Sequence, residues 1–191
     1  MGLKFGIHIM RGVPRLAVHN RMTVKGTEIS CHEIAHRSSI CAWNTDMYGI
    51  DADKPGAQAY YDSIFELYAG WGVDYVKVDD ICNVKATPLE EYSARREIEM
   101  IRTAIDRCGR GMVLSLSAVI SEAWHMAKHA NMWRITDDFW DNWPSLLEMF
   151  WRCEVWQAHV KPGQYPDCDM LPLGRIAITA DGRGHYTNFT K

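Results

Sequence analysis

The sequence lacks the features that mark several large classes of protein. No apolar run reaches the ~18 residues that a membrane-spanning helix requires. The formal net charge is only −3, and no concentration of positive charge is present that would bind nucleic acid or an acidic membrane surface. No Gly-rich phosphate loop follows any predicted strand, which argues against nucleotide binding. We therefore expect neither nucleic acid nor a membrane as a partner.

The six cysteines include no C-x-x-C pair, which excludes a zinc ribbon and a thioredoxin-like motif. Most of them are expected to be buried thiols, and they assign no compartment. What the sequence has in quantity is tryptophan, with 8 residues beside 8 tyrosines. Aromatic side chains in this number suggest stacking surfaces as well as a core. They hint at a ligand with flat apolar faces, such as a sugar.

A length of 191 residues suits a single domain, along which strands and helices alternate. The predicted strands are 3–9, 73–79, 111–117, 132–137 and 155–160. The predicted helices are 55–70, 88–107, 121–129 and 144–154. Repeated βα units imply a parallel sheet, either open and doubly wound or closed into a (β/α) barrel. Residues 10–52 read as a long loop, and the strand at the start suggests a piece of something larger.

Side-chain alternation in these strands favours the barrel. Lys77 and Asp79 share one face of their strand, as Ser115 and Ser117 do in the next, and His8 opposes apolar neighbours in the first. Strands of a doubly wound sheet are usually apolar on both faces. Polar side chains near the C-terminal ends of strands fit the mouth of a TIM-type barrel. Since such barrels typically need ~250 residues, we predict an incomplete one with about five of eight βα units.

Three acidic segments could carry chemistry. Lys77 could keep the Asp79 carboxylate ionised so that it serves as a nucleophile, but Asp79 and Asp80 could equally cap the next loop. The segment 133–143 combines three aspartates with tryptophans, which suits a sugar site, or a helix N-terminus with acids on its dipole. The segment 165–171 contains two acids in what reads as a turn.

His32-Glu33-Ile34-Ala35-His36 matches the H-E-x-x-H signature of zinc proteases. The spacing would place both histidines on one helical face, with Glu33 as base. However, the match lies in the long loop, and Ser39 stands where the longer metzincin pattern has a glycine. We interpret it as a chance occurrence without bound zinc, and zinc proteolysis is a remote alternative.

Four motifs occur together in order: Gly2–His8, Gly72–Asp79, Trp133-Arg134 with the acids after it, and Asp167–Leu171. On these motifs the sequence resembles the α-galactosidase and α-N-acetylgalactosaminidase family, glycoside hydrolase family 27 of the melibiase clan, over most of its length. The resemblance implies a (β/α)₈ catalytic barrel that hydrolyses terminal α-linked galactose or N-acetylgalactosamine. It implies a retaining double displacement with a carbohydrate substrate and with no metal or organic cofactor. Residues 1–191 would form one partial catalytic domain.

The resemblance also implies roles for individual residues. Asp79 matches the nucleophile. Asp138 matches the acid/base, and Asp137, which alternation would turn away, is the competing choice. Arg134 matches the arginine beside the sugar 2-position. The sugar-contacting positions of the family fall on Lys77, Arg134, Asp169 and Met170.

Some positions depart from the family. His8 stands where a tyrosine lines the pocket, and Ser117 replaces a glutamate that reads the 2-hydroxyl, as in enzymes that accommodate an acetamido group. Cys41 matches a family cysteine, which leaves a Cys41–Cys82 disulfide open. The family's first two strands, its eighth strand and its C-terminal β-domain have no match. A truncated, non-catalytic sugar-binding fragment is therefore the alternative, and a second copy could cover its open sheet edges.

Overall fold

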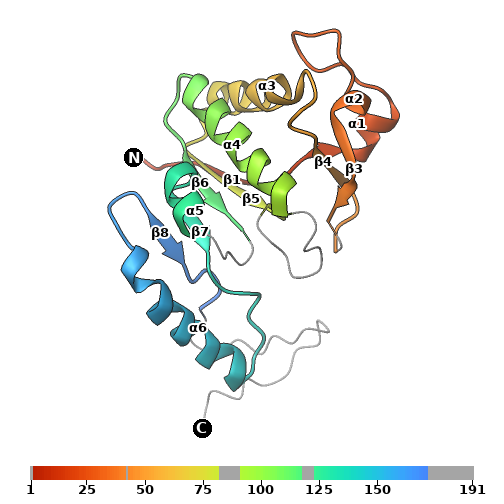
Figure 1. Cartoon of the computed structure of the whole chain (residues 1–191). Helices are drawn as coiled ribbons and strands as arrows, with labels where there is room; N and C mark the ends of the chain where they lie inside the picture. The colour runs from red at the N-terminus through yellow and green to blue at the C-terminus, as the bar shows by residue number, and fades with distance from the viewer. Residues whose placement is uncertain (1, 42, 82–90, 118–122, 172–191) are drawn as a thin grey trace.

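The computed structural model describes residues 2–41, 43–81, 91–117 and 123–171. Its central feature is a five-stranded parallel sheet in the order β1-β5-β6-β7-β8 (Figure 1). These strands are β1 (Gly6–Met10), β5 (Tyr75–Asp79), β6 (Val113–Leu116), β7 (Met132–Arg134) and β8 (Tyr165–Asp167). The helices between them are α3 (Ala57–Gly70), α4 (Glu91–Arg107), α5 (Ala123–His129) and α6 (Trp143–Trp156).

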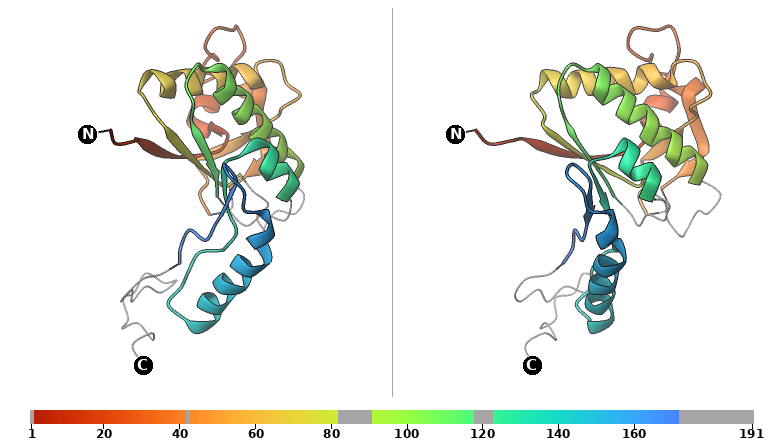
Figure 2. Two further views of the ribbon diagram at one scale, coloured as in Figure 1. Left: turned by 90° about the vertical axis from the view of Figure 1, so that its left-hand side faces the viewer. Right: turned by 60° about the vertical axis from the view of Figure 1, so that its left-hand side comes forward.

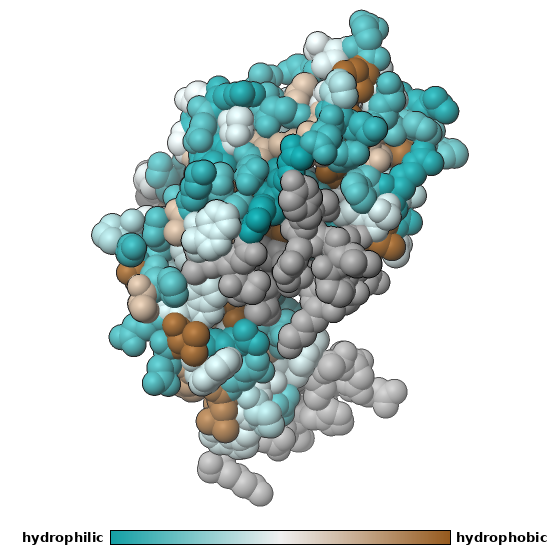
Figure 3. All heavy atoms as spheres, in the orientation of Figure 1, coloured by the Kyte–Doolittle hydropathy of each residue, from teal (hydrophilic) through white to brown (hydrophobic). Residues whose placement is uncertain are grey.

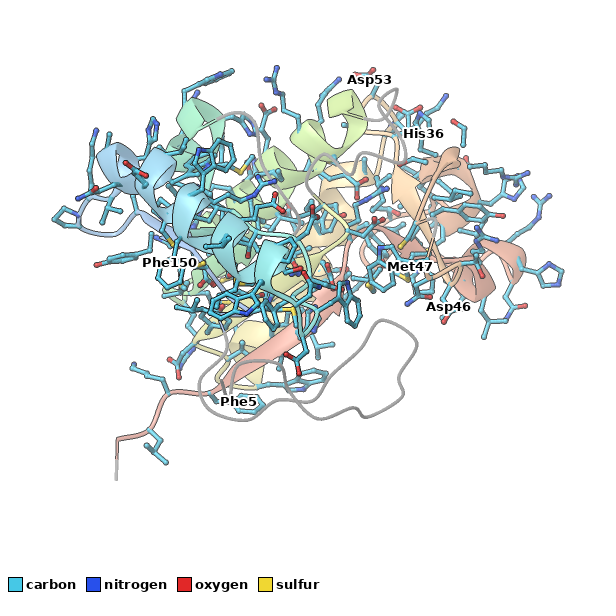
Figure 4. The ribbon with its side chains drawn as sticks, turned by 90° about the horizontal axis from the view of Figure 1, so that it is seen from below. Phe5, His36, Asp46, Met47, Asp53 and Phe150 are labelled. Atoms are coloured by element: carbon cyan, nitrogen blue, oxygen red, sulfur yellow. The ribbon has the colours of Figure 1, made fainter. Side chains whose placement is uncertain are left out.

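A second, smaller sheet lies between β1 and α3 in the chain. It is antiparallel, in the order β2-β4-β3. Its strands are β2 (Val13–Pro14), β3 (Ala35–Ile40) and β4 (Met47–Ile50), and it is accompanied by the short helices α1 (Arg15–His19) and α2 (Cys31–Ile34). This small sheet and α6 lie on opposite sides of the molecule, as His36 and Phe150 show in Figure 4.

The core lies between the parallel sheet and helices α3 and α4. Val76 and Val78 are fully buried on the helix-facing side of β5, where Phe65 of α3 and Ile101 of α4 are fully buried as well. Burying side chains of this size contributes roughly 1.5–3 kcal/mol each. Because neighbouring residues of a strand point to opposite faces, this packing leaves the alternate residues of β5 on the other side of the sheet.

The partial barrel predicted from the sequence is confirmed in its parallel strands and intervening helices. The predicted strand 155–160 is wrong. Trp156 continues the buried stripe of α6 and packs edge-to-face on Trp133 at a centroid distance of 6.4 Å, so the helix runs to Trp156 and a 3₁₀ turn follows at Gln157–His159. The fifth strand is instead β8, which has only three residues, one of them a proline.

One described helix start differs from expectation. Helix α3 begins at Ala57, two residues after the predicted start at 55, and follows Gly56, whose φ of +88° is left-handed. Helix α6 begins as the sequence predicts, because the Asn142 side chain accepts a hydrogen bond from the amide of Ser145 at 3.0 Å. The predicted start of α4, at residue 88, lies outside the described residues.

Residues 10–52 are not one loop, and this changes the meaning of the H-E-x-x-H match. Helix α2 ends at Ile34, where Glu33 closes a capping box on Ser30, and His36 already lies on β3. His32 contacts the Arg37 guanidinium, whereas His36 contacts the Ser38 hydroxyl. The single helical face that the zinc-protease signature requires is therefore not formed.

The parallel sheet stays open within the described part of the chain, with β1 and β8 at its two edges (Figure 2). Apolar side chains are exposed on α6, among them Leu147, Phe150, Trp151 and Val155. Figure 3 shows separate brown patches on this part of the surface. Among the described residues, no helix combines the length and apolar character needed to cross a membrane.

Gly12, which follows β1, offers a test of this packing. Its φ is +85°, and an added Cβ would lie 2.0 Å from the Tyr48 carbonyl oxygen, whereas Gly26 has a φ of +78° with nothing near its Cβ position. Gly26→Ala should lower the free energy of unfolding by about 1–2 kcal/mol, the left-handed backbone penalty. Gly12→Ala should lower the free energy of unfolding by a further ~1–3 kcal/mol, because the added Cβ overpacks against the Tyr48 carbonyl. Equal midpoints of urea denaturation for the two variants would contradict this.

Candidate active site

The C-terminal ends of the parallel strands bring distant polar residues together. In the sheet register His8 on β1 lies beside Lys77 on β5, and Met10 lies beside Asp79. At the other end of the sheet, Arg134 of β7 lies beside Asp167 of β8. The strand ends of a parallel sheet meet at one edge, and ligands bind there in barrels and open sheets alike.

Asp79 is the last residue of β5, on the face opposite the core. Its Oδ2 lies 3.2 Å from Nε2 of His8, and its Oδ1 accepts a hydrogen bond from the Asp80 amide at 2.9 Å. The carboxylate is therefore held by both oxygens while about a fifth of the side chain stays exposed. A held and accessible carboxylate is the arrangement that a nucleophile requires.

A second group of charges links β5, β7 and β8. Lys77 forms an ion pair with Asp169, whose Oδ2 also lies 3.8 Å from Nε of Arg134. Arg134 in turn donates from its terminal nitrogen to Oδ1 of Asp138 at 2.7 Å. Three of the predicted sugar-contacting residues, Lys77, Arg134 and Asp169, are thus in one connected network, and Met170 follows in a half-buried turn.

A cavity of about 490 Å³ opens beside these groups. Its described lining consists of Trp43, Asp79, Asp80, Arg134, Thr136, Asp137, Asp138 and Trp140. Its volume falls within the range of small-molecule sites, and two tryptophans with several carboxylates suit a polar ligand with apolar ring faces. Ser117 is buried after β6 and is not in that described lining.

The choice between Asp137 and Asp138 cannot rest on strand alternation. Strand β7 ends at Arg134, so the alternating pattern does not extend to either acid. Both are exposed, and both line the cavity. They differ in their contacts, since the ion pair with Arg134 involves Asp138.

Sequence reasoning missed a buried ionic cluster directly behind Asp79. The Arg11 guanidinium lies 3.3 Å from the Asp80 carboxylate and 3.0 Å from that of Glu97 on α4, and it donates to Ser39 Oγ at 2.8 Å. The Tyr61 hydroxyl donates to Glu97 as well. A signal was available, because Glu97 interrupts the apolar stripe of its amphipathic helix and is fully buried.

Burial changes several pKa values near the site. Desolvation raises the pKa of Glu97, which Arg11 and the Tyr61 hydroxyl oppose. Desolvation and the neighbouring Asp169 raise the pKa of Asp167. In the same loop, burial raises the pKa of the Cys168 thiol to about 12. Cys41 is a buried free thiol, and Cys82, its suggested disulfide partner, lies outside the described residues.

Comparisons with known proteins identify the family of the chain. The family model described as alpha galactosidase A matches residues 39–187. The chain belongs to this α-galactosidase family. Alpha-galactosidase 3 of Arabidopsis thaliana is 32% identical to it over 136 residues, which are 70% of this chain and 30% of that protein.

Two solved structures resemble nearly the whole chain of this family member. One is a glycoside hydrolase family 27 β-L-arabinopyranosidase from Geobacillus stearothermophilus, at 55% identity and a TM-score of 0.88, covering 99% of this chain and 44% of that one. The other is a Bacillus halodurans protein provisionally described as an α-N-acetylgalactosaminidase, at 54% identity and a TM-score of 0.75. That match covers 99% of this chain and 43% of the other. The chain therefore spans less than half the length of these relatives.

The buried cluster makes a prediction about stability. Arg11→Met leaves Asp80 and Glu97 without their shared cation, and breaking a buried ion pair typically costs about 3–5 kcal/mol. Lys25→Met is the matched control, because it removes a 3.3 Å pair with Glu66 whose side chains are both mostly exposed, and it should change the unfolding midpoint little. Chemical denaturation followed by circular dichroism measures both, and similar small effects would show that the cluster is not needed.

Proposed function

We propose that this chain is the catalytic portion of a retaining glycosidase that removes terminal α-linked galactose or a closely related sugar. The observation that carries the proposal is that Asp79 and Asp138 line one cavity, with Arg134 at its wall. Retaining glycosidases use two carboxyl groups that flank the scissile bond, one as nucleophile and the other as acid and then base. Membership of the α-galactosidase family supports the substrate class.

In the first step, the Asp79 carboxylate attacks the anomeric carbon while Asp138 donates its proton to the glycosidic oxygen. The bond between the anomeric carbon and that oxygen breaks, and its electron pair leaves with the protonated aglycone. In the second step, Asp138 removes a proton from water, and the oxygen of that water displaces Asp79 from the sugar. Two inversions restore the original anomeric configuration.

The neighbouring charges fit these roles. His8 lies 3.2 Å from Asp79 and can orient its carboxylate toward the sugar. Arg134 is positioned to hold Asp138 and to exchange that contact for a sugar hydroxyl. Lys77 and Asp169 offer a donor and an acceptor for further hydroxyls, which would replace their mutual ion pair when a sugar binds.

A β-L-arabinopyranoside is the second candidate substrate. The ring of β-L-arabinopyranose has the configuration of α-D-galactopyranose at carbons 1 to 4 and lacks only the hydroxymethyl group. The same catalytic carboxylates could therefore act on either sugar. The 55% identity to a β-L-arabinopyranosidase supports this candidate.

At the 2-position, the family resemblance places Ser117 where a glutamate would read a hydroxyl. The shorter side chain leaves room for an acetamido group, and the similarity to the Bacillus halodurans protein supports N-acetylgalactosamine as a third sugar of the same class. The rest of a longer chain, or a second copy, would cover the open edges at β1 and β8.

The catalytic roles can be tested by trapping. Incubation with an activated 5-fluoro glycosyl fluoride of each candidate sugar, which keeps the substituent at the 2-position, should add one glycosyl group to the protein, detected by intact mass and located on Asp79 by peptide mapping. Asp79→Asn should abolish the adduct. Asp138→Asn should lower turnover of unactivated glycosides by about 10²–10⁴-fold, the usual effect of losing a general acid, whereas Asp137→Asn should have a smaller effect.

An adduct on another residue would refute the assignment of Asp79. A larger loss of turnover for Asp137→Asn than for Asp138→Asn would assign the acid/base role to Asp137. If the folded chain forms no adduct with any of the three sugars, the non-catalytic fragment is the correct description.

Specificity can be tested at Ser117. We expect Ser117→Glu to lower the ratio of kcat/KM for p-nitrophenyl α-N-acetylgalactosaminide over the α-galactoside by roughly 10–200-fold, the effect of one unfavourable pocket contact. Ser117→Ala keeps the space and should leave the ratio nearly unchanged. An unaltered ratio in a folded Ser117→Glu protein would show that this position does not meet the sugar.

A further inference from the structure

A cluster of potential metal ligands lies outside the cavity, between α4 and α5. His125 and His129 are one turn apart on α5, and Glu99 faces them from α4. Nε2 of His125 lies 3.2 Å from Oε1 of Glu99, and the two imidazole rings have centroids 4.6 Å apart. One ligand atom from each of the three residues lies within 4.8 Å of the others.

The cluster is buried on one side and open to solvent on the other. His125 is buried, whereas Glu99 and His129 are each half-buried. Figure 1 shows α4 and α5 as neighbouring helices on the outer layer of the fold, and the two helices are in contact. An ion could therefore enter from solvent, reach all three side chains and keep a coordination position for water.

We propose that Glu99, His125 and His129 form a binding site for a divalent transition metal ion of the zinc class, which joins α4 to α5. Two histidines at i and i+4 present their nitrogens on one helical face, and a carboxylate with two imidazoles plus one open position is a frequent set of protein ligands for zinc. At metal–ligand distances of ~2.0–2.1 Å, tetrahedral ligand atoms lie about 3.4 Å apart. The distance of 3.2 Å between His125 and Glu99 already fits this geometry. Rotation of the His129 side chain would bring its nitrogen to the same distance from the other two ligand atoms.

The types of ligand favour this class of metal over calcium or magnesium, although positive side chains lie nearby. Arg95 and Lys128 act on His125, and Lys128 and Arg102 act on His129, while Glu99 supplies the only carboxylate of the three. Hard cations need several oxygen ligands, which this cluster does not provide. Zinc, cobalt, nickel and copper bind imidazole nitrogen well.

Burial lowers the pKa of both histidines, whereas Glu99 raises it. A histidine must be neutral to bind a metal, so uptake should weaken as pH falls.

Binding would affect the part of the fold that supports the cavity. Helix α4 carries both Glu99 and, two residues earlier, Glu97, which pairs with Arg11 behind Asp79. A metal that joins α5 to α4 would stabilise α4 without touching the cavity residues. The site would thus be structural, and its occupancy is independent of whether the chain hydrolyses glycosides.

The test is metal titration of the 191-residue chain after treatment with EDTA. Cobalt(II) should give the visible absorption bands of a low-coordinate site with nitrogen ligands, and zinc should abolish them by competition. Glu99→Gln and His129→Gln should each weaken metal binding by about tenfold or more. Even mutations of residues that only hold the ligands in place typically lower metal affinity about 10–100-fold. His36→Gln is the matched control, because His36 is also half-buried and belongs to the H-E-x-x-H segment.

Thermal unfolding provides a second measurement. Zinc should raise the Tm of the wild-type chain and of His36→Gln, because a ligand that binds only the folded state stabilises it. At the same zinc concentration, the Tm of Glu99→Gln and of His129→Gln should rise less. The proposal is overturned if the wild-type chain takes up no cobalt or zinc at about neutral pH, if the two ligand variants bind as well as wild type, or if His36→Gln removes the binding.

Discussion

The position of the candidate nucleophile depends on one buried guanidinium. Arg11 follows β1 and pairs with Asp80 after β5 and with Glu97 on α4, while its hydrogen bond to Ser39 reaches the small sheet. Asp80 has a φ of +53°, a left-handed conformation that is unusual outside glycine. The cation therefore holds the backbone turn that directly follows Asp79. Buried ion pairs add little net stability, but they penalise every arrangement in which a partner is lost.

The Arg11 cluster also helps to join the two sheets. The apolar core continues from the parallel sheet to the small sheet, where Val13 and Ile50 are fully buried, and the hydrogen bond from Arg11 to Ser39 adds a polar contact. Gly49 on β4 illustrates how closely the parts approach, since a Cβ there would lie 2.5 Å from Ser39 Oγ and 2.6 Å from an Arg11 terminal nitrogen. Trp43, which leads into β4, also lines the cavity. The segment that reads as a loop in the sequence thus forms one wall of the site.

Much of the fold followed from local sequence patterns, and the exceptions have physical reasons. The strand β5 was predictable because Val76 and Val78 alternate with Lys77 and Asp79. Strand β8 was not, because three residues with a proline carry no periodicity, and its place is set by pairing with β7. The small sheet was missed because β3 contains serines and an irregular register between His36 and Ile40. Its pairing depends on β4 and on the core beneath.

The site residues divide in the same way, into those that a local motif identifies and those that only the fold brings together. Asp79, Lys77, Arg134 and Asp169 were identified from motifs, and the structure brings them to neighbouring strand ends. Arg11 and Glu97 could not be paired from the sequence, because they are 86 residues apart and meet only after the sheet and α4 have packed. Two titratable partners at such a separation leave no local pattern. Only the charge on an apolar helix face hints that a partner exists.

The high pKa of Cys168 has a consequence for the charge of the β8 loop. Burial raises this pKa to about 12, and the neighbouring Cys153, Asp167 and Asp169 raise it as well, so the thiol keeps its proton at neutral pH. It therefore adds no third negative charge beside the carboxylate that pairs with Lys77. The negative charge at this end of the sheet is thus that of the carboxylates alone.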